Sequence, residues 1–295
     1  MTGKHVTLSD GSAIEASTLG ANNGGGLVVN ATESVELNNT PSTLAAQVYP
    51  GVTGNGGNLT ISTKDLLVRD GAFISTSTSG KGNGGNLTFN ASGSVQLIGG
   101  SLDSSAKPDS NGNAGDIKVN AQTINLSNQA IISSSNAGQG NAGNILMQAQ
   151  DNLSANNNSL IASNIGSPQG QPAKGNVGNI EISARTVSLS DGAQLQAGFY
   201  SGGQRNAGLV SVKAKDIISF TGTNSGIFAD VESGAVGNGS DIQISARSVY
   251  LTNGAVVNTS NAGLGNSGNI TVTAQTINLN NQGFITSSTL GQGRG

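Results

Sequence analysis

A five-residue motif, Gly-Asn-x-Gly followed by Asn or Asp, returns along the chain every 28 to 35 residues. Repetition at such a period is typical of a solenoid, in which each repeat buries its apolar face only against its neighbours. Copies of the motif begin at Gly54, Gly82, Gly112, Gly140, Gly175, Gly237 (with Ser240 in place of the second glycine) and Gly265, with weaker versions at Asn22 and Arg205. The motif therefore favours one continuous stack of repeats over a set of separate globular domains.

The residues that follow each motif alternate in polarity, which is the pattern of extended strands. The repeat that begins at Gly112 shows this most clearly. The residues expected to point inward form three short runs: Ile117, Val119 and Ala121; Ile124 and Leu126; and Ala130, Ile132 and Ser134. Only a few polar residues join one run to the next. Three short strands and three corners are therefore predicted for each coil.

The other repeats show the same alternation, with two inward-facing residues in each strand. In the first strand the inward pairs are Leu59/Ile61, Leu87/Phe89, Ile145/Met147, Ile180/Ile182, Ile242/Ile244 and Ile270/Val272. In the second strand they are Val35/Leu37, Leu66/Val68, Val95/Leu97, Val187/Leu189, Val249/Leu251 and Ile277/Leu279. The repeat after Arg205 fits only with a slip in the pattern, as Leu209 and Val212. We therefore expect continuous rows of buried aliphatic side chains along the stack.

Composition separates a solenoid from the alternatives. The chain has 295 residues with 45 glycines, 3% aromatic residues and no tryptophan, which is too few large side chains for a conventional core. Disorder is disfavoured because the aliphatic residues recur in phase, and helix because Gly, Asn, Ser and Thr are poor helix formers. The predicted fold is all-β: a single-stranded, right-handed parallel β-helix of about ten coils of 28–35 residues, each with three short strands.

We interpret residues 1–295 as one continuous β-helix array. Residues 1–21 and 289–295 each match only part of a coil, so the chain is predicted to be an internal segment of a longer array. An aliphatic layer and unpaired strand edges at a cut end would be a template for another coil. End-to-end self-association is therefore expected. No stretch has the pattern of a signal peptide or of a membrane-spanning segment.

Two rows of polar residues are predicted to run along the stack. An asparagine occupies the second position of each motif, where stacked amides can form hydrogen bonds from coil to coil; a ligand site is the alternative. This structural ladder comprises Asn55, Asn83, Asn113, Asn141, Asn176, Asn206, Asn238 and Asn266. A second, inward ladder of hydroxyl groups is expected at Thr76, Ser104, Ser134, Ser163, Thr259 and Ser287.

The sequence indicates no cofactor site. It lacks cysteine, has one histidine, and spreads 13 basic residues along the chain at a net charge of −3, which argues against nucleic-acid binding. Matches to G-x-G-x-x-G, such as residues 80–85, precede a strand rather than a helix, so they do not indicate a dinucleotide site. Aspartate stands at only two of the positions where calcium-binding repeats would need it, Asp116 and Asp241. Neither a cofactor nor a metal is expected.

The carboxylates do not form a recognisable catalytic set. Asp10, Asp70 and Asp191 each precede a glycine at the corner before the third strand, where Asp-Gly is typical of a turn. Asp230 and Glu232 are close in sequence, but no further acid or base is in phase with them on the neighbouring coils. No catalytic residue is assigned, and the chain is not expected to be an enzyme.

Some side chains of the third strand are predicted to face outward. A possible outward contact row consists of Phe73, Ile131, Val256 and Phe284. A regularly spaced hydroxyl face accompanies it, formed by Ser75, Ser77, Ser133, Ser135, Thr286 and Ser288. This hydroxyl face is missing from coils six to eight.

Segments such as Gly140–Ala149 (GNAGNILMQA) and Gly265–Leu279 (GNSGNITVTAQTINL) resemble the β-helical repeats of filamentous haemagglutinin-type exoproteins, the secreted partners of two-partner secretion systems. Cyanobacterial members share this Asn/Gly/Ser-rich composition. The resemblance covers almost the whole chain, without the family's amino-terminal secretion domain or any carboxy-terminal effector domain. It implies a right-handed β-helix, secretion to or beyond the cell surface through an outer-membrane transporter, and contact of the parent protein with surface glycans or other cells.

These observations lead to one functional expectation and two alternatives. The chain is expected to be an extracellular structural or adhesive segment of a large secreted protein, acting as a rigid stalk and a scaffold for surface contact. One alternative is a carbohydrate-active β-helix that binds or cleaves polysaccharides. A second is an ice- or crystal-binding protein, which a regular hydroxyl face would suit.

Overall fold

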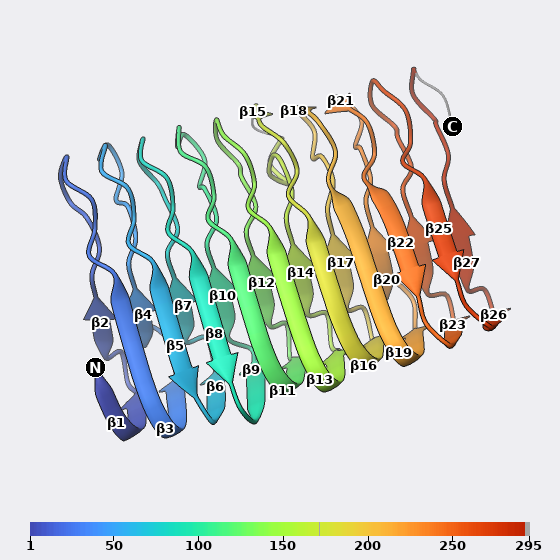
Figure 1. Ribbon diagram of the computed structural model, residues 1–295. Helices are drawn as coiled ribbons and strands as arrows, with labels where there is room; N and C mark the ends of the chain where they lie inside the picture. Colours follow the sequence, from blue (N-terminus) through green and yellow to red (C-terminus); the bar gives the residue numbers. More distant parts are fainter. Residues whose placement is uncertain (171, 293–295) are drawn as a thin grey trace.

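The computed structural model describes residues 1–170 and 172–292. These residues form strands that stack in parallel into a β-solenoid, and Figure 1 shows the two ends of the chain at opposite ends of the stack. The predicted fold class is thereby confirmed, and the arrangement is consistent with a right-handed parallel β-helix of roughly ten coils. No helix among the described residues is long and apolar enough to cross a membrane. Residues 293–295, part of the predicted final partial coil, lie outside the described residues.

The third strand of each coil is three residues long and contributes to a ten-stranded parallel sheet, which lies behind the longer strands in Figure 1. We number the coils 1 to 10 by these strands and call residues at the same position in successive coils a column. The strands are β2 (Ala13–Glu15), β4 (Thr43–Ala45), β7 (Phe73–Ser75), β10 (Ser101–Asp103), β12 (Ile131–Ser133), β14 (Leu160–Ala162), β17 (Gln194–Gln196), β20 (Gly226–Phe228), β24 (Val256–Asn258) and β27 (Phe284–Thr286).

The first and second strands of the coils belong to one 14-stranded sheet that bends around a corner. In five coils the two run on as a single strand: β3 (Leu27–Asn38), β11 (Ile117–Ser127), β13 (Ile145–Ala155), β16 (Ile180–Ser190) and β19 (Leu209–Thr221). The other members are β1 (Thr2–Leu8), β5 (Leu59–Thr63), β6 (Asp65–Arg69), β8 (Leu87–Ala91), β9 (Ser94–Ile98), β22 (Asp241–Ser245), β23 (Ser248–Thr252), β25 (Ile270–Thr273) and β26 (Thr276–Asn280). The corner between the two strands is so short that the sheet absorbs it as a shift of register.

A small three-stranded sheet, which the sequence did not predict, connects the return loops that follow coils 6, 7 and 8. It consists of β15 (Ala173–Lys174), β18 (Gly203–Arg205) and β21 (Val236–Gly237), paired in parallel. These returns belong to repeats of 35, 30 and 32 residues, longer than the shortest repeats of 28. Single parallel bridges from Gln139 to Lys174 and from Val236 to Leu264 continue this pairing into the returns of two 28-residue repeats.

The core consists of aliphatic columns that run the length of the stack. The inward residues predicted from the sequence are buried in the first and second strands of coils 3 to 7 and of coil 9. Ile145, for example, is 0% exposed and pairs with Ile117 in the coil before it and Ile180 in the coil after it. Each coil therefore covers the apolar layer of its neighbour, which is how a solenoid stabilises repeats that cannot fold alone.

Coil 8 requires a correction to the predicted register. Val210 and Val212 point inward and are 0% exposed, whereas Leu209 is only partly buried and pairs with Asp241. Leu209 occupies the position that holds Asn or Asp in other coils, one residue before the inward pair. No slip of register occurs, and the prediction that Leu209 points into the core is wrong.

The corner between the second and third strands is a tight turn. Asp70 and Gly71 have φ angles of 56° and 80°, and Asn128 and Gln129 have φ angles of 55° and 63°. Two successive positive φ values are those of a type I′ turn, for which Asp-Gly and Asn-Gly are the favoured sequences. The aspartates of the Asp-Gly pairs are therefore turn residues, as predicted.

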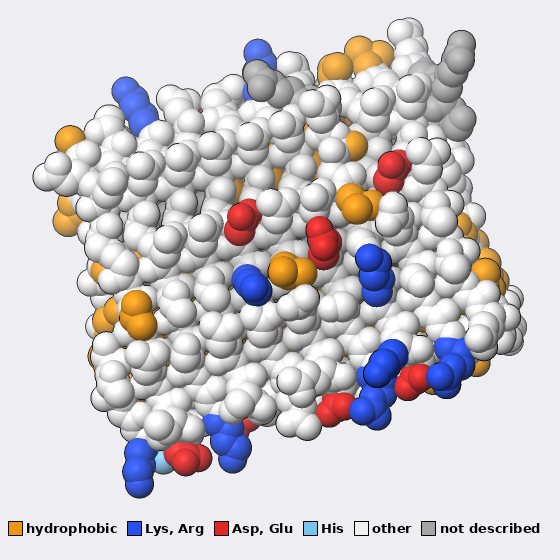
Figure 2. Space-filling view, viewed as in Figure 1, with side chains coloured by type: hydrophobic (Ala, Val, Ile, Leu, Met, Phe, Trp, Pro, Cys, Tyr) orange, Lys and Arg blue, Asp and Glu red, His pale blue; other side chains and the backbone are white. Residues whose placement is uncertain are grey.

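Charged side chains gather along one edge of the stack, which Figure 2 shows below a face that is mostly uncharged and polar. The charges include ion pairs between adjacent coils. Arg185 Nη2 lies 3.0 Å from Asp151 Oδ1, and Arg247 Nη1 lies 3.3 Å from Asp216 Oδ1. Exposed pairs of this kind contribute about 0–1 kcal/mol each. Because acids and bases alternate, the edge is not a concentrated basic surface.

Coil 10 leaves its inward side chains uncovered. Ile277 and Leu279 pair with the buried Val249 and Leu251 of coil 9, yet they are 47% and 44% exposed because no further described coil packs on them. End-to-end self-association stays a prediction, which sedimentation of the chain over a concentration series would check.

Candidate functional site

The eight asparagines of the predicted ladder lie in one column on the return loops, where seven are exposed and Asn176 is half-buried. Along most of this column the Oδ1 atom of one asparagine accepts a hydrogen bond from the backbone N–H of the asparagine in the next coil. The N–O distances are 2.8 Å for Asn83 to Asn55, 2.8 Å for Asn113 to Asn83, 2.7 Å for Asn141 to Asn113, 2.9 Å for Asn176 to Asn141, 3.4 Å for Asn206 to Asn176 and 2.9 Å for Asn266 to Asn238. The side-chain oxygen, rather than amide-to-amide stacking, makes most of these contacts.

A second exposed column, three residues further along each motif, makes the same contact. The N–O distances are 2.9 Å for Asn86 to Asn58, 2.8 Å for Asp116 to Asn86, 2.7 Å for Asn144 to Asp116, 2.9 Å for Asn179 to Asn144, 2.9 Å for Leu209 to Asn179 and 2.8 Å for Asn269 to Asp241. Asp116 and Asp241 therefore replace asparagine as acceptors of a backbone N–H. Because the contact needs only an acceptor oxygen, either side chain fits this column.

Removal of one ladder oxygen is expected to have a small, specific effect on stability. Replacing Asn113 by Ala removes the acceptor for the N–H of Asn141, which should lower the free energy of unfolding by about 0.5–1.5 kcal/mol. Replacing Asn113 by Asp keeps an acceptor oxygen and should cost clearly less. Urea denaturation followed by circular dichroism would compare the two variants. Equal losses in both would show that the oxygen is not what the column requires.

The inward hydroxyl groups bond mainly across the coil rather than along the stack. Thr76 Oγ1 and Ser104 Oγ each donate to the carbonyl oxygen of Gly85 at 2.6 Å, and Ser163 Oγ donates to the carbonyl oxygen of Gly143 at 2.8 Å. Thr76 Oγ1 also lies 3.1 Å from Ser104 Oγ. These buried hydroxyls therefore tie the third strand to the glycine-rich return loop, which gives them a structural role.

The four residues of the possible outward contact row share one column of the third-strand sheet but do not form a continuous patch. In order of pairing the column reads Thr43, Phe73, Ser101, Ile131, Leu160, Gln194, Gly226, Val256 and Phe284. Within the row only Val256 and Phe284 are neighbours. Leu160, which was not among the predicted outward residues, pairs with Ile131. The column therefore carries two short apolar pairs separated by polar residues and glycine.

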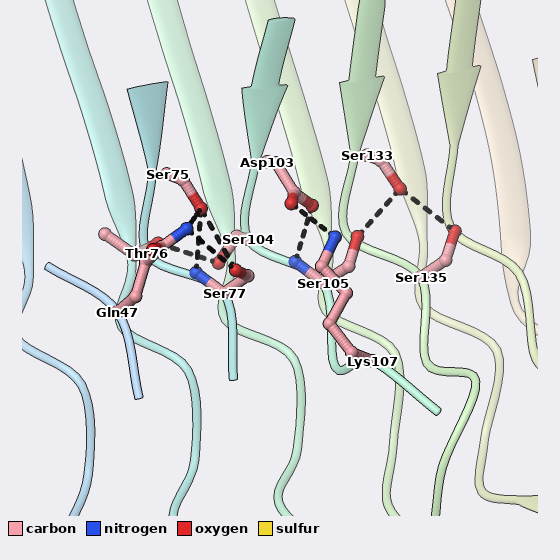
Figure 3. A network of polar contacts seen from close by, with 10 residues as sticks. All are labelled: Gln47, Ser75, Thr76, Ser77, Asp103, Ser104, Ser105, Lys107, Ser133 and Ser135. Carbon is pink, nitrogen blue, oxygen red and sulfur yellow. Dashed lines mark hydrogen bonds and ion pairs between the residues drawn. The ribbon is translucent and has the colours of Figure 1, made fainter. Parts of the chain in front are cut away.

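The hydroxyl face over β7, β10 and β12 is a network of side chains that bond to each other (Figure 3). Ser75 Oγ lies 3.1 Å from Ser77 Oγ, and Ser133 Oγ lies 3.3 Å from Ser135 Oγ. At the same edge Lys107 forms an ion pair with Asp103. These polar side chains hold the outer edge of the sheet together, and many of their hydrogen-bonding groups are already occupied.

A narrow cleft opens on the same sheet face where that network ends. It has a volume of about 130 Å³ and is lined by Asn164, Gln194, Gln196, Gly198, Phe199, Tyr200, Phe228, Asp230 and Glu232. Asn164, Gly198 and Asp230 occupy the same position in coils 6, 7 and 8, so the middle coil contributes no side chain between the other two. A side chain at position 198 would require the backbone of the next coil to move, because a Cβ atom on Gly198 would lie 2.1 Å from the backbone oxygen of Asp230.

The amide side chains of the cleft are bonded to each other and to its floor. Gln196 Oε1 accepts hydrogen bonds from Tyr200 Oη and from Asn164 Nδ2, both at 3.1 Å. Gln196 Nε2 donates to Gln194 Oε1 at 2.6 Å, and Asn164 Oδ1 accepts from the backbone N–H of Gly198 at 2.9 Å. The amides therefore fix the position of the Tyr200 ring. The surfaces that remain for a ligand are the exposed parts of the Tyr200 and Phe228 rings and the carboxyl groups of Asp230 and Glu232. Each carboxyl group accepts one backbone N–H, from Ser260 and Ser201 respectively, which leaves its other lone pairs available.

The electrostatic environment of the cleft perturbs two of its acids. Burial raises the pKa of Asp230 to about 6; the N–H of Ser260 and the side chain of Asn258 act in the opposite direction, and the charge of Glu232 raises it further. Burial also raises the pKa of Tyr200, to which the charge of Glu232 adds, so its hydroxyl stays protonated near neutral pH. Because the folded-state pKa of Asp230 lies above its usual 3.8, its ionisation as pH rises through about 6 destabilises the fold.

Asp230 and Glu232 are close in sequence, but no site was predicted for them. An alignment of the third strands of all coils does contain a pattern that indicates the cleft. Most coils place Ser or another small polar residue two positions beyond the strand, whereas Gly198 and Asp230 break that pattern in adjacent coils. The coils in which the predicted hydroxyl face is missing, six to eight, are the coils that form the cleft.

Comparison with family models, with curated proteins and with solved structures finds no match to the chain. Within residues 1–170 and 172–292, no group of three or more His, Cys, Asp and Glu side chains is placed to hold a metal ion. What the chain does must therefore be argued from its geometry and chemistry.

Proposed function

We propose that the chain is a rigid extracellular scaffold, a segment of a secreted or cell-surface protein that acts as a stalk and as a surface for contact. The observation that supports this most is the uninterrupted pairing of the third strands through ten coils. At about 4.8 Å per coil such a stack is a rod about 45 Å long, with every coil fixed by hydrogen bonds to its neighbours. A rigid rod with polar sides suits a stalk, which keeps the structures attached at its two ends a fixed distance apart.

The proposal includes a cellular location, outside the cell or at its surface, and partners for the parent protein. The resemblance of the repeats to filamentous haemagglutinin-type exoproteins supports secretion through an outer-membrane transporter. It also supports contact of the parent protein with surface glycans or other cells. Labelling intact producing cells with an antibody against the folded chain should stain their surface. Staining that appears only after the cells are permeabilised would contradict an extracellular position.

Adhesion can be measured on the chain itself. Beads coated with the folded chain are expected to resist detachment from cell surfaces under flow, and beads coated with an unfolded variant should detach as albumin-coated beads do. Ile145→Asp is a suitable unfolded control because Ile145 is fully buried. If folded chain and albumin give the same detachment, the adhesive role is wrong and only the stalk role remains.

The two alternatives receive less support from the geometry. A surface that binds ice needs free hydroxyl groups, whereas the serines of the hydroxyl face bond to each other. A polysaccharide-binding cleft needs free hydrogen-bonding groups, whereas the amides beside Gly198 bond to each other. Thermal hysteresis would support the first alternative, and new reducing ends released from a polysaccharide would support the second.

A further inference from the structure

The cleft beside Gly198 carries negative charge that the chain does not neutralise. Two of its lining residues, Asp230 and Glu232, are carboxylic acids, and none is Lys, Arg or His. Neither acid takes part in an ion pair formed among the described residues. A carboxylate that is shielded from water is normally paired with a positive charge. The chemistry of the cleft therefore favours a cationic ligand.

Aromatic side chains distinguish this cleft from a site for a bare metal ion. The chain contains only three tyrosines and six phenylalanines, yet the partly exposed rings of Tyr200 and Phe228 both line this one cleft, together with the buried Phe199. The face of an aromatic ring attracts an organic cation, most strongly a weakly hydrated quaternary ammonium group. Two carboxyl groups together with exposed parts of aromatic rings suit an ammonium group that carries apolar substituents.

The hydrogen bonds within the cleft argue against a neutral sugar. Gln196 Oε1 already accepts two hydrogen bonds, and Asn164 and Gln194 are engaged with their neighbours. A polyhydroxylated ligand would have to break these bonds or leave its own hydroxyls unpaired, which lowers affinity. A quaternary ammonium group has no hydrogen-bonding groups to satisfy, and a primary ammonium group can donate to the carboxylates.

The size of the cleft limits the ligand to a small group. Its volume of about 130 Å³ corresponds to about four water molecules at roughly 30 Å³ each. Sites for drug-sized molecules measure roughly 300–1,000 Å³. The cleft therefore has room for one head group, while anything attached to that group would extend over the open sheet face.

We propose that this cleft binds a small organic cation, a primary or quaternary ammonium group, between the rings of Tyr200 and Phe228 and the carboxylates of Asp230 and Glu232. The proposal goes beyond the scaffold function and does not depend on it. A chain that binds the cation but does not adhere would refute the adhesive role alone, and the reverse result would refute the cation site alone.

Calorimetric titration of the folded chain with choline tests the proposal directly. We expect saturable binding in the millimolar range, and binding at least about tenfold weaker for 3,3-dimethylbutan-1-ol, which has the shape of choline without its charge. Butylammonium separates a primary from a quaternary ammonium ligand, and tighter binding of either one supports the proposal. Cellobiose represents a neutral sugar. Binding of the neutral alcohol or of cellobiose as tight as that of choline would overturn the proposal, as would no saturable binding of either cation at tens of millimolar.

Single substitutions test the named residues. Asp230→Asn keeps the side-chain shape and removes the charge, and Phe228→Leu keeps an apolar side chain and removes the ring; each should weaken choline binding about fivefold or more. Glu181→Gln and Phe73→Leu are matched controls in other parts of the surface, and both should bind as the unmodified chain does. Circular dichroism of each variant confirms that it is folded. Unchanged binding by folded Asp230→Asn would contradict the assignment.

The pH dependence gives an independent readout, because choline keeps its charge at every pH. The titratable groups that line the cleft are Asp230, Glu232 and Tyr200. The pKa of Asp230 is raised to about 6, so the carboxyl group is mostly ionised at pH 7.5 and mostly protonated at pH 5. Choline affinity should therefore fall as the pH is lowered across this range, and less so in Asp230→Asn. An affinity that is constant between these two pH values in the unmodified chain would contradict a role for Asp230.

Discussion

Replacing Ile145 by Asp is expected to unfold the coils around it. Ile145 is 0% exposed, lies between Ile117 and Ile180 in a column of aliphatic side chains, and has no polar group to pair with a carboxylate. The loss of a buried isoleucine alone costs about 2–5 kcal/mol, and a buried unpaired charge adds several kcal/mol more. The total is comparable to the stability of a whole domain, about 5–15 kcal/mol. Circular dichroism and limited proteolysis would detect the loss of structure.

The matched control introduces the same residue on the outside of the stack. Ser188 lies between Val187 and Leu189 on β16, so its side chain points outward, beside those of Ser154 and Ser219. Ser188→Asp should change the free energy of unfolding by less than about 1 kcal/mol. If both aspartate variants lose the same amount of stability, the register assigned to these strands is wrong.

Replacing Gly115 by Ala is expected to disrupt the contact between coils 4 and 5. A Cβ atom on Gly115 would lie 2.0 Å from the carbonyl oxygen of Gly85 and 2.6 Å from Ser104 Oγ. The first of these atoms belongs to the backbone of the neighbouring coil, so it cannot move aside without breaking the stack. Overpacking in a rigid environment costs about 1–3 kcal/mol, and we expect a value near the upper end.

The same close approach recurs along a column of glycines, which makes the expected effect general. A Cβ atom at any of them would lie within 2.4 Å of a backbone oxygen in the preceding coil: Gly57, Gly85, Gly115, Gly143, Gly178, Gly208 and Gly268. Gly20 is the control, because a Cβ atom there meets nothing within 4 Å. Thermal melting should show a clear decrease for Gly115→Ala and almost none for Gly20→Ala. Similar decreases for both would mean that backbone flexibility, rather than space, requires the glycine.

The fold was largely predictable because each repeat carries the same local information. Alternating polarity, a turn sequence and a glycine-rich return recur about ten times, so an error in one coil is corrected by the others. The exception was Leu209, an apolar residue that resembles a core residue but occupies the position of Asn or Asp, one residue before the inward pair of the first strand. The neighbouring coils fix the register there, since Val210 must pair with Ile180 and Ile242.

The cleft was not predictable because it depends on residues that share no local pattern. Asn164, Tyr200 and Asp230 lie on different coils, and stacking alone brings them together around the gap at Gly198. Their hydrogen bonds and the raised pKa of Asp230 arise only from that juxtaposition. An alignment of the repeats with each other could show where the hydroxyl face is interrupted. It could not show which side chains surround that interruption.

The sequence by itself determined that this chain is a parallel β-solenoid, which residues face its core and where its asparagine columns run, because these features repeat with the period of the coil. The tertiary structure decided what each repeated residue does. It shows that the asparagines act through a single oxygen, because the next coil presents a backbone N–H to that atom. It shows that the motif glycines are required by backbone oxygens of the preceding coil. The cleft at Gly198 arises in the same way, since a side chain that is missing from one coil creates space only between the coils that flank it.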